Sequence, residues 1–367
     1  MKWIDSQPPF EEAMERMSAS ALVAVDTEAD SLHSYFDKVC LIQMSAAGED
    51  VVIDPLSGIR LDSFGKLLGD PTITKVLHGG DYDLRILNRD FGFVVSNLID
   101  TSICAQLLGY EAFGLAALLE RHFGVKLNKV HQRADWAMRP LPPDMLEYAA
   151  LDTHYLIDLA AKLREELEVL GRWGWALEEF VRLEGVRYEK NEDPDPWRRL
   201  KNIGGFDRRS LAILRDLHSW RDAHARKADR PPFKIMGNEQ LLEMAKARPV
   251  TVADLSKIKG MSRYVLDRYG RELVNVIRSG MAIDESDLPE KNEPKSWQRD
   301  RELEARVERM KKIRDKIAAE LKIDRAVLAP RHILAAVAAA GSYDVPSMRE
   351  WQKKVLGDTM LAALKKS

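Results

Sequence analysis

Two carboxylates stand two residues apart behind an apolar run, and they are the first candidates for chemistry. The run at residues 21–25 precedes Asp26 and Glu28, and small or β-branched apolar residues of this kind favour a strand buried on both faces. Because side chains alternate along a strand, both acids are expected on one face. Unpaired acids are costly in low dielectric, whereas paired carboxylates suit Mg²⁺ or Mn²⁺. Most D-x-E pairs are solvated loop acids, so the pair alone does not decide.

Later acids and a tyrosine stand where they could complete such a site. In LHGGDYDLRIL a strand ends near His78 and a helix begins near Asp81, which can cap that helix. Asp83 lies one turn further and has less need of this role. In LEYAALDTHYLIDL, Tyr148 and Asp152 are four residues apart on a helix and face the same way. A purely structural hydrogen bond between phenol and carboxylate is the alternative for this pair.

The residue pattern predicts a mixed sheet with packed helices in the first half of the chain. Early strands close together, followed by alternating helices and strands, indicate this architecture. The expected strands are 21–28, 38–46, 50–54, 73–78 and 97–101, and the expected helices are 60–69, 82–90, 102–109, 114–123 and 143–170.

After a polar, proline-bearing break at residues 189–196, the strand signals stop and helical patterns continue to the end. A second break ends near residue 297. Each of the two helical parts opens on a long helix and reaches a segment begun by proline, as in a loose duplication. The predicted organisation is an α/β domain at 1–190 and two helical domains at 203–285 and 297–367.

The ordered set of D-x-E, H-x4-D from His78 to Asp83, and Y-x3-D from Tyr148 to Asp152 resembles the DEDD exonuclease superfamily in its tyrosine-bearing branch. LIDTSICAQLLGY and DWAMRPL resemble ribonuclease D, and GNEQLLEMAKARPVTVADLSKIKGMSRYVLDRYGRELVNVI resembles the nucleic-acid-binding HRDC domain. The C-terminal part is a weaker match to the same module. The resemblance implies a ribonuclease H-like mixed sheet with flanking helices, followed by two all-α HRDC-like domains.

The resemblance also implies an activity: hydrolysis of RNA from its 3′ end into nucleoside 5′-monophosphates with two divalent ions, Mg²⁺ or Mn²⁺. By position, Asp26 would bridge the ions, Glu28 and Asp152 would complete the first metal site, and Asp83 would hold the second. Tyr148 would orient the attacking water, because a phenol with a pKa of about 10 is a poor base at neutral pH. Precursor tRNA 3′ ends are the expected substrates.

The net charge of −2 hides an asymmetry between the two halves. Residues 1–190 carry 19 basic and 31 acidic side chains, a net charge of −12, which leaves 37 and 27 for residues 191–367, a net charge of +10. The basic half is expected to attract the phosphate backbone that the acidic half repels; the alternative is that its helices only solvate themselves. Candidate RNA contacts are Arg121, Lys126, Lys129, Arg133, Arg139, Lys257, Lys259 and Arg263.

Other features predict the setting of the protein. Asp100 ends a strand and is expected to cap the next helix, and His78 is expected to be structural. No window reaches the ~18–20 apolar residues of a membrane span, and the N-terminal residues lack a signal-peptide core. Cys40 and Cys104 stand alone in apolar settings, which favours a reducing, cytoplasmic location. No heptad seam is present, so a monomer is expected.

Two other functions fit parts of the pattern. A 3′–5′ DNA exonuclease would use the same acids, because the choice of sugar depends on how the pocket treats the 2′-hydroxyl. A non-catalytic adaptor would bind nucleic acid without cutting it, and the loss of one acid would favour that reading. All four acids are present.

Overall fold

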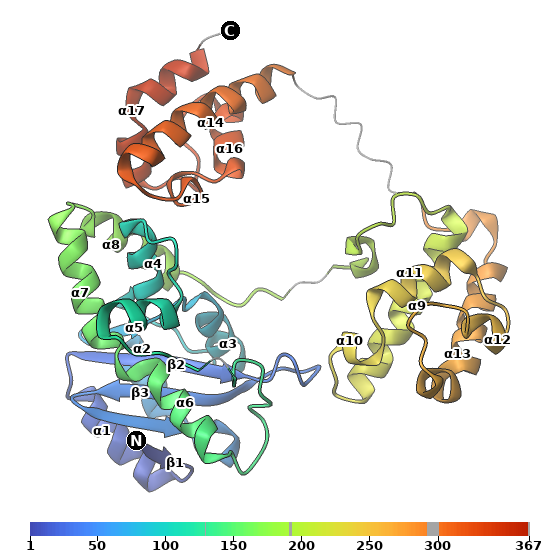
Figure 1. Cartoon of the computed structure of the whole chain (residues 1–367), viewed down its shortest axis with the longest axis horizontal. Helices are drawn as coiled ribbons and strands as arrows, with labels where there is room; N and C mark the ends of the chain where they lie inside the picture. The colour runs from blue at the N-terminus through green and yellow to red at the C-terminus, as the bar shows by residue number, and fades with distance from the viewer. Residues whose placement is uncertain (129, 191–192, 292–300, 366–367) are drawn as a thin grey trace. The chain divides into compact units, whose positions relative to one another are not determined.

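The computed structural model describes residues 1–128, 130–190, 193–291 and 301–365, which fall into two compact units (Figure 1). The first unit contains residues 1–30 and 38–188 together with the C-terminal helices. The second contains residues 31–37 and the helices between residues 193 and 291. The expected start of the last domain at residue 297 lies outside the described residues.

A six-stranded mixed sheet forms the centre of the first unit. Its strands are β1 (Lys2–Ile4), β2 (Leu22–Ala29), β3 (Val39–Ala46), β4 (Glu49–Ile53), β5 (Thr74–Leu77) and β6 (Leu98–Asp100), in the spatial order β1-β4-β3-β2-β5-β6. The β2–β3 and β3–β4 pairs are antiparallel and the other pairs are parallel. The mixed sheet predicted from the sequence is confirmed, although β1 was not expected.

Eight α-helices of the first unit accompany the sheet in the described residues before the linker. They are α1 (Gln7–Ser18), α2 (Asp62–Gly69), α3 (Asp81–Phe91), α4 (Thr101–Leu108), α5 (Leu115–Phe123), α6 (Pro143–His154), α7 (Leu156–Val169) and α8 (Trp173–Glu184), and a short 3-10 turn, η1, covers Pro55–Ser57. The expectation of one helix over 143–170 is wrong. Tyr155, with φ −99° and ψ −2°, separates α6 from α7, so the two helices follow separate paths.

The two faces of the sheet have different partners. Helix α6 packs across β2, β3 and β4 (Figure 1). Leu41 and Val52 share a core with Ala149 on this face. The alternate strand residues, among them Val25 and Ile42, belong to the main core with Phe10. Period-two alternation therefore separates an α6-covered face from the main core.

Four C-terminal helices complete the first unit: α14 (Arg301–Leu321), α15 (Arg325–Leu328), α16 (Arg331–Ala340) and α17 (Glu350–Lys365). Trp351 stacks on Trp175 of α8 with ring centroids 4.8 Å apart, and its Nε1 donates to Glu179 Oε1 at 3.0 Å. Arg349 pairs with the same carboxylate group. These helices therefore share a core with the sheet domain.

The second unit is helical, as the sequence predicts. It contains η2 (Pro196–Arg199), α9 (Arg208–Lys227), α10 (Pro232–Ile235), α11 (Asn238–Ala247), α12 (Val252–Leu255), α13 (Arg263–Ala282) and η3 (Glu285–Asp287). Leu214, Leu241 and Leu273 are buried in its core. Among the residues described in either unit, no helix has the length and apolar character needed to cross a membrane.

Candidate active site

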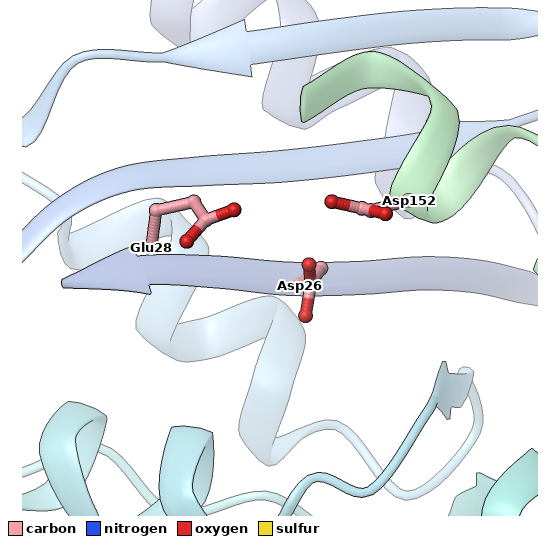
Figure 2. A group of neighbouring side chains, drawn as sticks. All are labelled: Asp26, Glu28 and Asp152. Atoms are coloured by element: carbon pink, nitrogen blue, oxygen red, sulfur yellow. The ribbon is translucent and has the colours of Figure 1, made fainter. Parts of the chain in front are cut away.

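Three carboxylates converge between β2 and α6. Asp26 and Glu28 project from the same face of β2, and Asp152 comes from α6; one oxygen of each lies within 4.8 Å of the others (Figure 2). Asp26 lies inside the strand, since β2 continues to Ala29. The acids thus face a packed helix, and their positions follow from the i, i+2 alternation of the strand and the seating of α6 on it.

The fourth acid, Asp83, sits in the first turn of α3 and is held by Thr27, whose hydroxyl donates to its carboxylate. Gly79 precedes the helix at φ +69°, a left-handed conformation that favours glycine. The amides of Gly79 and Gly80 donate to Asp100 at 3.1 and 2.8 Å. Asp100 also caps α4 as expected. Its carboxylate therefore connects the turn before α3 to the end of β6 and the start of α4.

Tyr148 lies on α6 between two aromatic side chains from the preceding loop. The Trp136 ring stacks against it at 6.2 Å, and the His131 ring meets it edge-on at 5.7 Å. His131 is held in turn by Asp144, with 3.1 Å between Nε2 and Oδ2. The phenol is therefore fixed in orientation by residues that the motif search did not select, although the DWAMRPL segment contains one of them.

The acids lack basic partners: among the described residues no Lys or Arg forms an ion pair with Asp26, Glu28, Asp83 or Asp152. Burial, followed by repulsion from Asp152 and Asp83, raises the pKa of Glu28 to about 9. Burial raises the pKa of Asp152 to about 7. Burial, and then the neighbouring acids, raise that of Asp26 well above its ordinary value. Within the described part of the chain, no positive charge offsets this repulsion.

This donor set fits divalent cations. Three carboxylates with converging oxygens offer the hard oxygen ligands that Mg²⁺ and Mn²⁺ prefer. A cation there would offset both the desolvation of the acids and their mutual repulsion. The cluster gathers Asp26, Glu28 and Asp152. Asp83, bound to Thr27, is outside this group, but its charge helps to raise the pKa of both Asp26 and Glu28.

The acids open onto a cleft of about 490 Å³. Its lining includes Asp26, Glu28, Asp152, Tyr148 and His78, and the segment from Ala112 to Leu127 closes another side with Asn128 and Gln132. The cleft therefore combines the acids with neutral amide side chains.

Gln43 is a buried neighbour of the site that the sequence search missed. It pairs with Asp26 across the β2–β3 ladder and with Val52 across β3–β4. Its side chain is fully buried, and neither its Nε2 nor its Oε1 has a hydrogen-bond partner within the described residues. A glutamine inside the apolar segment CLIQMSA was the available signal, because an apolar strand has no packing need for an amide.

The basic candidates near the cleft have different surroundings. The Arg139 guanidinium binds both oxygens of Asp54 at 2.6 and 2.7 Å and donates to Cys40 O, so it ties loop to sheet. Arg121 stacks over the Tyr110 ring at 3.9 Å. Lys126 is exposed and 3.6 Å from Glu120. Arg133 is exposed, and Lys129 lies outside the described residues.

In the second unit, the three basic candidates lie at the α12–α13 hairpin. Lys257 pairs with Asp254 at 2.9 Å, Lys259 is exposed beside Gly260, and Arg263 is 95% exposed at the start of α13. They form an exposed basic edge within that unit.

Comparisons with known proteins agree with this geometry. Residues 1–168 match a family described as 3′–5′ exonuclease, and residues 210–277 match the HRDC domain. The chain is 30% identical to ribonuclease D of Acidiphilium cryptum over 350 residues, covering 95% of this chain and 88% of that protein. It is 33% identical to ribonuclease D of Escherichia coli over 277 residues, covering 75% and 74%.

Solved structures show the same likeness. The crystal structure of Escherichia coli RNase D, described as an exoribonuclease involved in structured RNA processing, aligns with a TM-score of 0.72 at 28% identity, covering 99% of this chain and 98% of that one. A protein from Bifidobacterium adolescentis aligns with a TM-score of 0.85 at 28% identity, covering 100% and 97%. The catalytic core of RRP6 from Trypanosoma brucei aligns with a TM-score of 0.68 at 31% identity, covering 76% and 79%.

Proposed function

Because this chain belongs to the ribonuclease D family and is therefore a hydrolytic 3′–5′ exoribonuclease, we propose that it trims precursor tRNA 3′ ends through a two-metal-ion site. The observation that carries the proposal is the convergence, beside an oriented tyrosine, of three carboxylates that have no basic partner among the described residues. The exonuclease fold implies dependence on a divalent metal. Two ions, and Mg²⁺ or Mn²⁺ as their identity, are the proposed detail.

When bound, the cations would polarise the scissile phosphate and lower the pKa of the attacking water. Asp26, Glu28 and Asp152 would hold one ion, with Asp26 shared with a second that Asp83 helps to hold. Thr27 fixes the Asp83 carboxylate, and the Asp100-bound turn fixes the start of its helix. The chain itself thus supplies a rigid set of oxygens.

Tyr148 would orient the attacking water by donating a hydrogen bond from its phenol O–H. Burial, and then the charges of Asp152 and Glu28, raise the pKa of Tyr148 above its ordinary value. The phenol therefore keeps its proton at neutral pH and serves in positioning, not as a base. Trp136 and His131 hold the ring for that role.

The helical parts are proposed to supply RNA affinity. Residues 1–190 would form the catalytic domain, and 203–285 and 297–367 two HRDC-like domains, with Lys257, Lys259 and Arg263 contacting phosphates. The basic net charge after residue 190 supports this assignment. A monomer in the cytoplasm is proposed as the working state, and the two free, buried thiols are compatible with that location.

A time course on matched 5′-labelled RNA and DNA oligonucleotides and on a tRNA with a 3′ extension tests the proposal. Each is incubated with Mg²⁺, Mn²⁺ or EDTA. Asp26→Asn is the inactive control, and Glu12→Gln, which changes an exposed acid on α1, is the matched active control. The expected result is a metal-dependent 3′ ladder on RNA that stops near the mature tRNA end.

Other outcomes have distinct meanings. A faster ladder on DNA would place the chain with DNA exonucleases. Binding of RNA without cleavage by the wild-type protein would favour an adaptor. Equally fast shortening of every RNA, with no preference for the extended tRNA, would refute the proposed substrate. It would not contradict the exoribonuclease activity.

A further inference from the structure

His78 lies at the same cleft as the candidate metal ligands Asp26 and Glu28. The last paired residues of the parallel strands β2 and β5 are Ala24 and Val76. Asp26 lies two residues beyond Ala24 within β2, and His78 lies two residues beyond Val76, directly after β5 ends at Leu77. His78 lines the cleft together with Asp26 and Glu28. The imidazole is therefore part of the substrate cavity.

The tautomer of His78 is fixed by Thr101. The Thr101 hydroxyl has one proton and donates it to Leu77 O at 3.0 Å, since a carbonyl oxygen can only accept. His78 Nδ1 lies 2.9 Å from the same hydroxyl oxygen, so Nδ1 carries the proton and donates. Nε2 is then the unprotonated nitrogen, with a lone pair directed away from Thr101.

Nε2 is consequently an acceptor without a donor. No hydrogen bond to it occurs in the described part of the chain. Burial lowers the pKa of His78 below its ordinary value, against an opposing effect of Asp100, which keeps the ring neutral at neutral pH. The cleft is thus lined by a neutral imidazole whose Nε2 can only accept a hydrogen bond, and the neighbouring acids would bind cations.

We propose that His78 Nε2 accepts a hydrogen bond from the 2′-hydroxyl of the 3′-terminal nucleotide and makes His78 a determinant of sugar specificity. The proposal rests on the exoribonuclease function stated above. A 3′–5′ exonuclease must accept any terminal base, and ribose hydroxyls are the donors that every RNA nucleotide presents near its scissile phosphate. DNA would leave Nε2 buried and unpaired, which a site built for a hydroxyl penalises.

Two substitutions separate the two nitrogens of the ring. His78→Asn retains a donor at the position of Nδ1, facing Thr101, and removes the acceptor at Nε2. His78→Gln places an amide oxygen near the position of Nε2. His332→Asn, an exposed histidine on α16, is the matched control. Thermal unfolding verifies that each variant is folded.

The substrates are three RNA oligonucleotides that differ only at the last residue, which is ribo, 2′-deoxy or 3′-deoxy. Release of that first nucleotide is measured under single-turnover conditions with Mg²⁺. The wild-type protein and His332→Asn are expected to favour the ribo end over the 2′-deoxy end about tenfold. In His78→Asn the ratio should fall to about one, mainly through slower release of the ribo nucleotide, and His78→Gln should retain part of the preference.

Each failure has its own signature. An active wild-type protein whose ribo to 2′-deoxy ratio is unchanged by His78→Asn would overturn the inference alone. So would a wild-type penalty at the 3′-deoxy end that His78→Asn abolishes while the 2′-deoxy ratio stays. A wild-type protein that releases no nucleotide from any of the three would overturn the proposed function and the inference together.

Discussion

At the scale of single residues, the cluster of buried acids has a cost that the folded chain bears in the absence of cations. Asp26, Glu28 and Asp152 share a small volume, and their carboxylates repel each other. Binding sites often retain such locally unfavourable arrangements because the ligand relieves them. The site should therefore be visible in stability measurements as well as in activity.

The pH dependence of the metal-free protein follows from the raised pKa of Glu28. Between its ordinary value and about 9, folded Glu28 holds a proton that the unfolded chain releases, so the free energy of unfolding falls as pH rises through this window. Glu28→Gln should remove part of that slope and stabilise the metal-free protein at pH 8 by on the order of 2 kcal/mol. Denaturant unfolding in EDTA at pH 5 to 9 measures it. A steeper slope in the variant would contradict the assignment.

Tyr148 can be tested apart from the metal ligands. Tyr148→Phe keeps the ring between Trp136 and His131 and removes the hydroxyl. The variant should lose about 10²-fold in single-turnover rate with an unchanged Mg²⁺ affinity, because the hydroxyl positions water and is not expected to hold the metal. Tyr155→Phe, also in this helical region, is the control. Loss of Mg²⁺ affinity in Tyr148→Phe would assign the phenol to the metal site.

Removal of the buried Gln43 amide is expected to stabilise the protein. An unpaired buried amide costs about 1–3 kcal/mol, so Gln43→Met should raise the free energy of unfolding by about 1–2 kcal/mol. Gln352, equally buried, accepts from Arg349 N and donates to Val327 O. Gln352→Met is therefore the matched control and should destabilise. A fall in stability for Gln43→Met would mean that its amide has a bound partner in solution, such as a buried water.

At the scale of elements, the site depends on how closely α6 approaches the sheet. Ala149 is fully buried against β3 with Leu41 and Val52, and its small side chain lets α6 bring Asp152 within reach of β2. Asp152 of α6 is more than a hundred residues away in sequence from Asp26 and Glu28 of β2. The geometry of the acid cluster thus depends on this one helix–sheet contact.

A larger residue at Ala149 should separate the two halves of the site. Ala149→Leu is expected to cost about 1–3 kcal/mol by overpacking and to weaken Mg²⁺ binding at least tenfold, because Asp152 moves away from Asp26. Calorimetric titration with Mg²⁺ and denaturant unfolding measure the two effects. Ala161→Leu, on the exposed side of α7, is the control. Normal Mg²⁺ affinity in a destabilised Ala149→Leu would show that the contact does not set the site.

At the scale of the whole molecule, the C-terminal helices belong to the core of the first unit. Trp351 is 1% exposed and stacks on Trp175, and Arg172 donates to Leu321 O. Their removal would expose this surface. A deletion of residues 298–367, which the charge pattern suggests as a test of RNA affinity, would therefore also remove packing from the catalytic part.

Trp351→Ala in the full chain tests this structural role. It should lower the free energy of unfolding by about 3–5 kcal/mol, because it leaves a cavity beside Trp175 and removes a donor to Glu179. Leu177→Ala, at an exposed residue of helix α8, which carries Trp175 and Glu179, should change stability little. Denaturant unfolding of the two variants provides the comparison. Equal stability of both would show that the C-terminal helices dock weakly.

Local patterns in the sequence were sufficient to predict the main elements and the residues on them. Short runs of apolar and β-branched residues identified β2 to β6, and helical spacing placed Tyr148 and Asp152 on one face, since both patterns depend only on neighbours in the chain. Short or weakly patterned elements escaped: β1 has three residues, and α1 begins with two prolines in its first turn. The division at Tyr155 also escaped, because the apolar periodicity continues through it.

Only the tertiary structure decided which distant side chains meet. The strand register places Gln43 opposite Asp26, the cleft brings His78 to the same acids, and the packing of the α5–α6 loop places Trp136 on Tyr148. The docking of Trp351 on α8 likewise joins residues separated by more than 170 positions. Such contacts depend on how preformed elements fit together, and the spacing of residues along the chain carries no information about that fit. The sequence therefore determined which acids could bind metal, and the fold determined which side chains lie beside those acids.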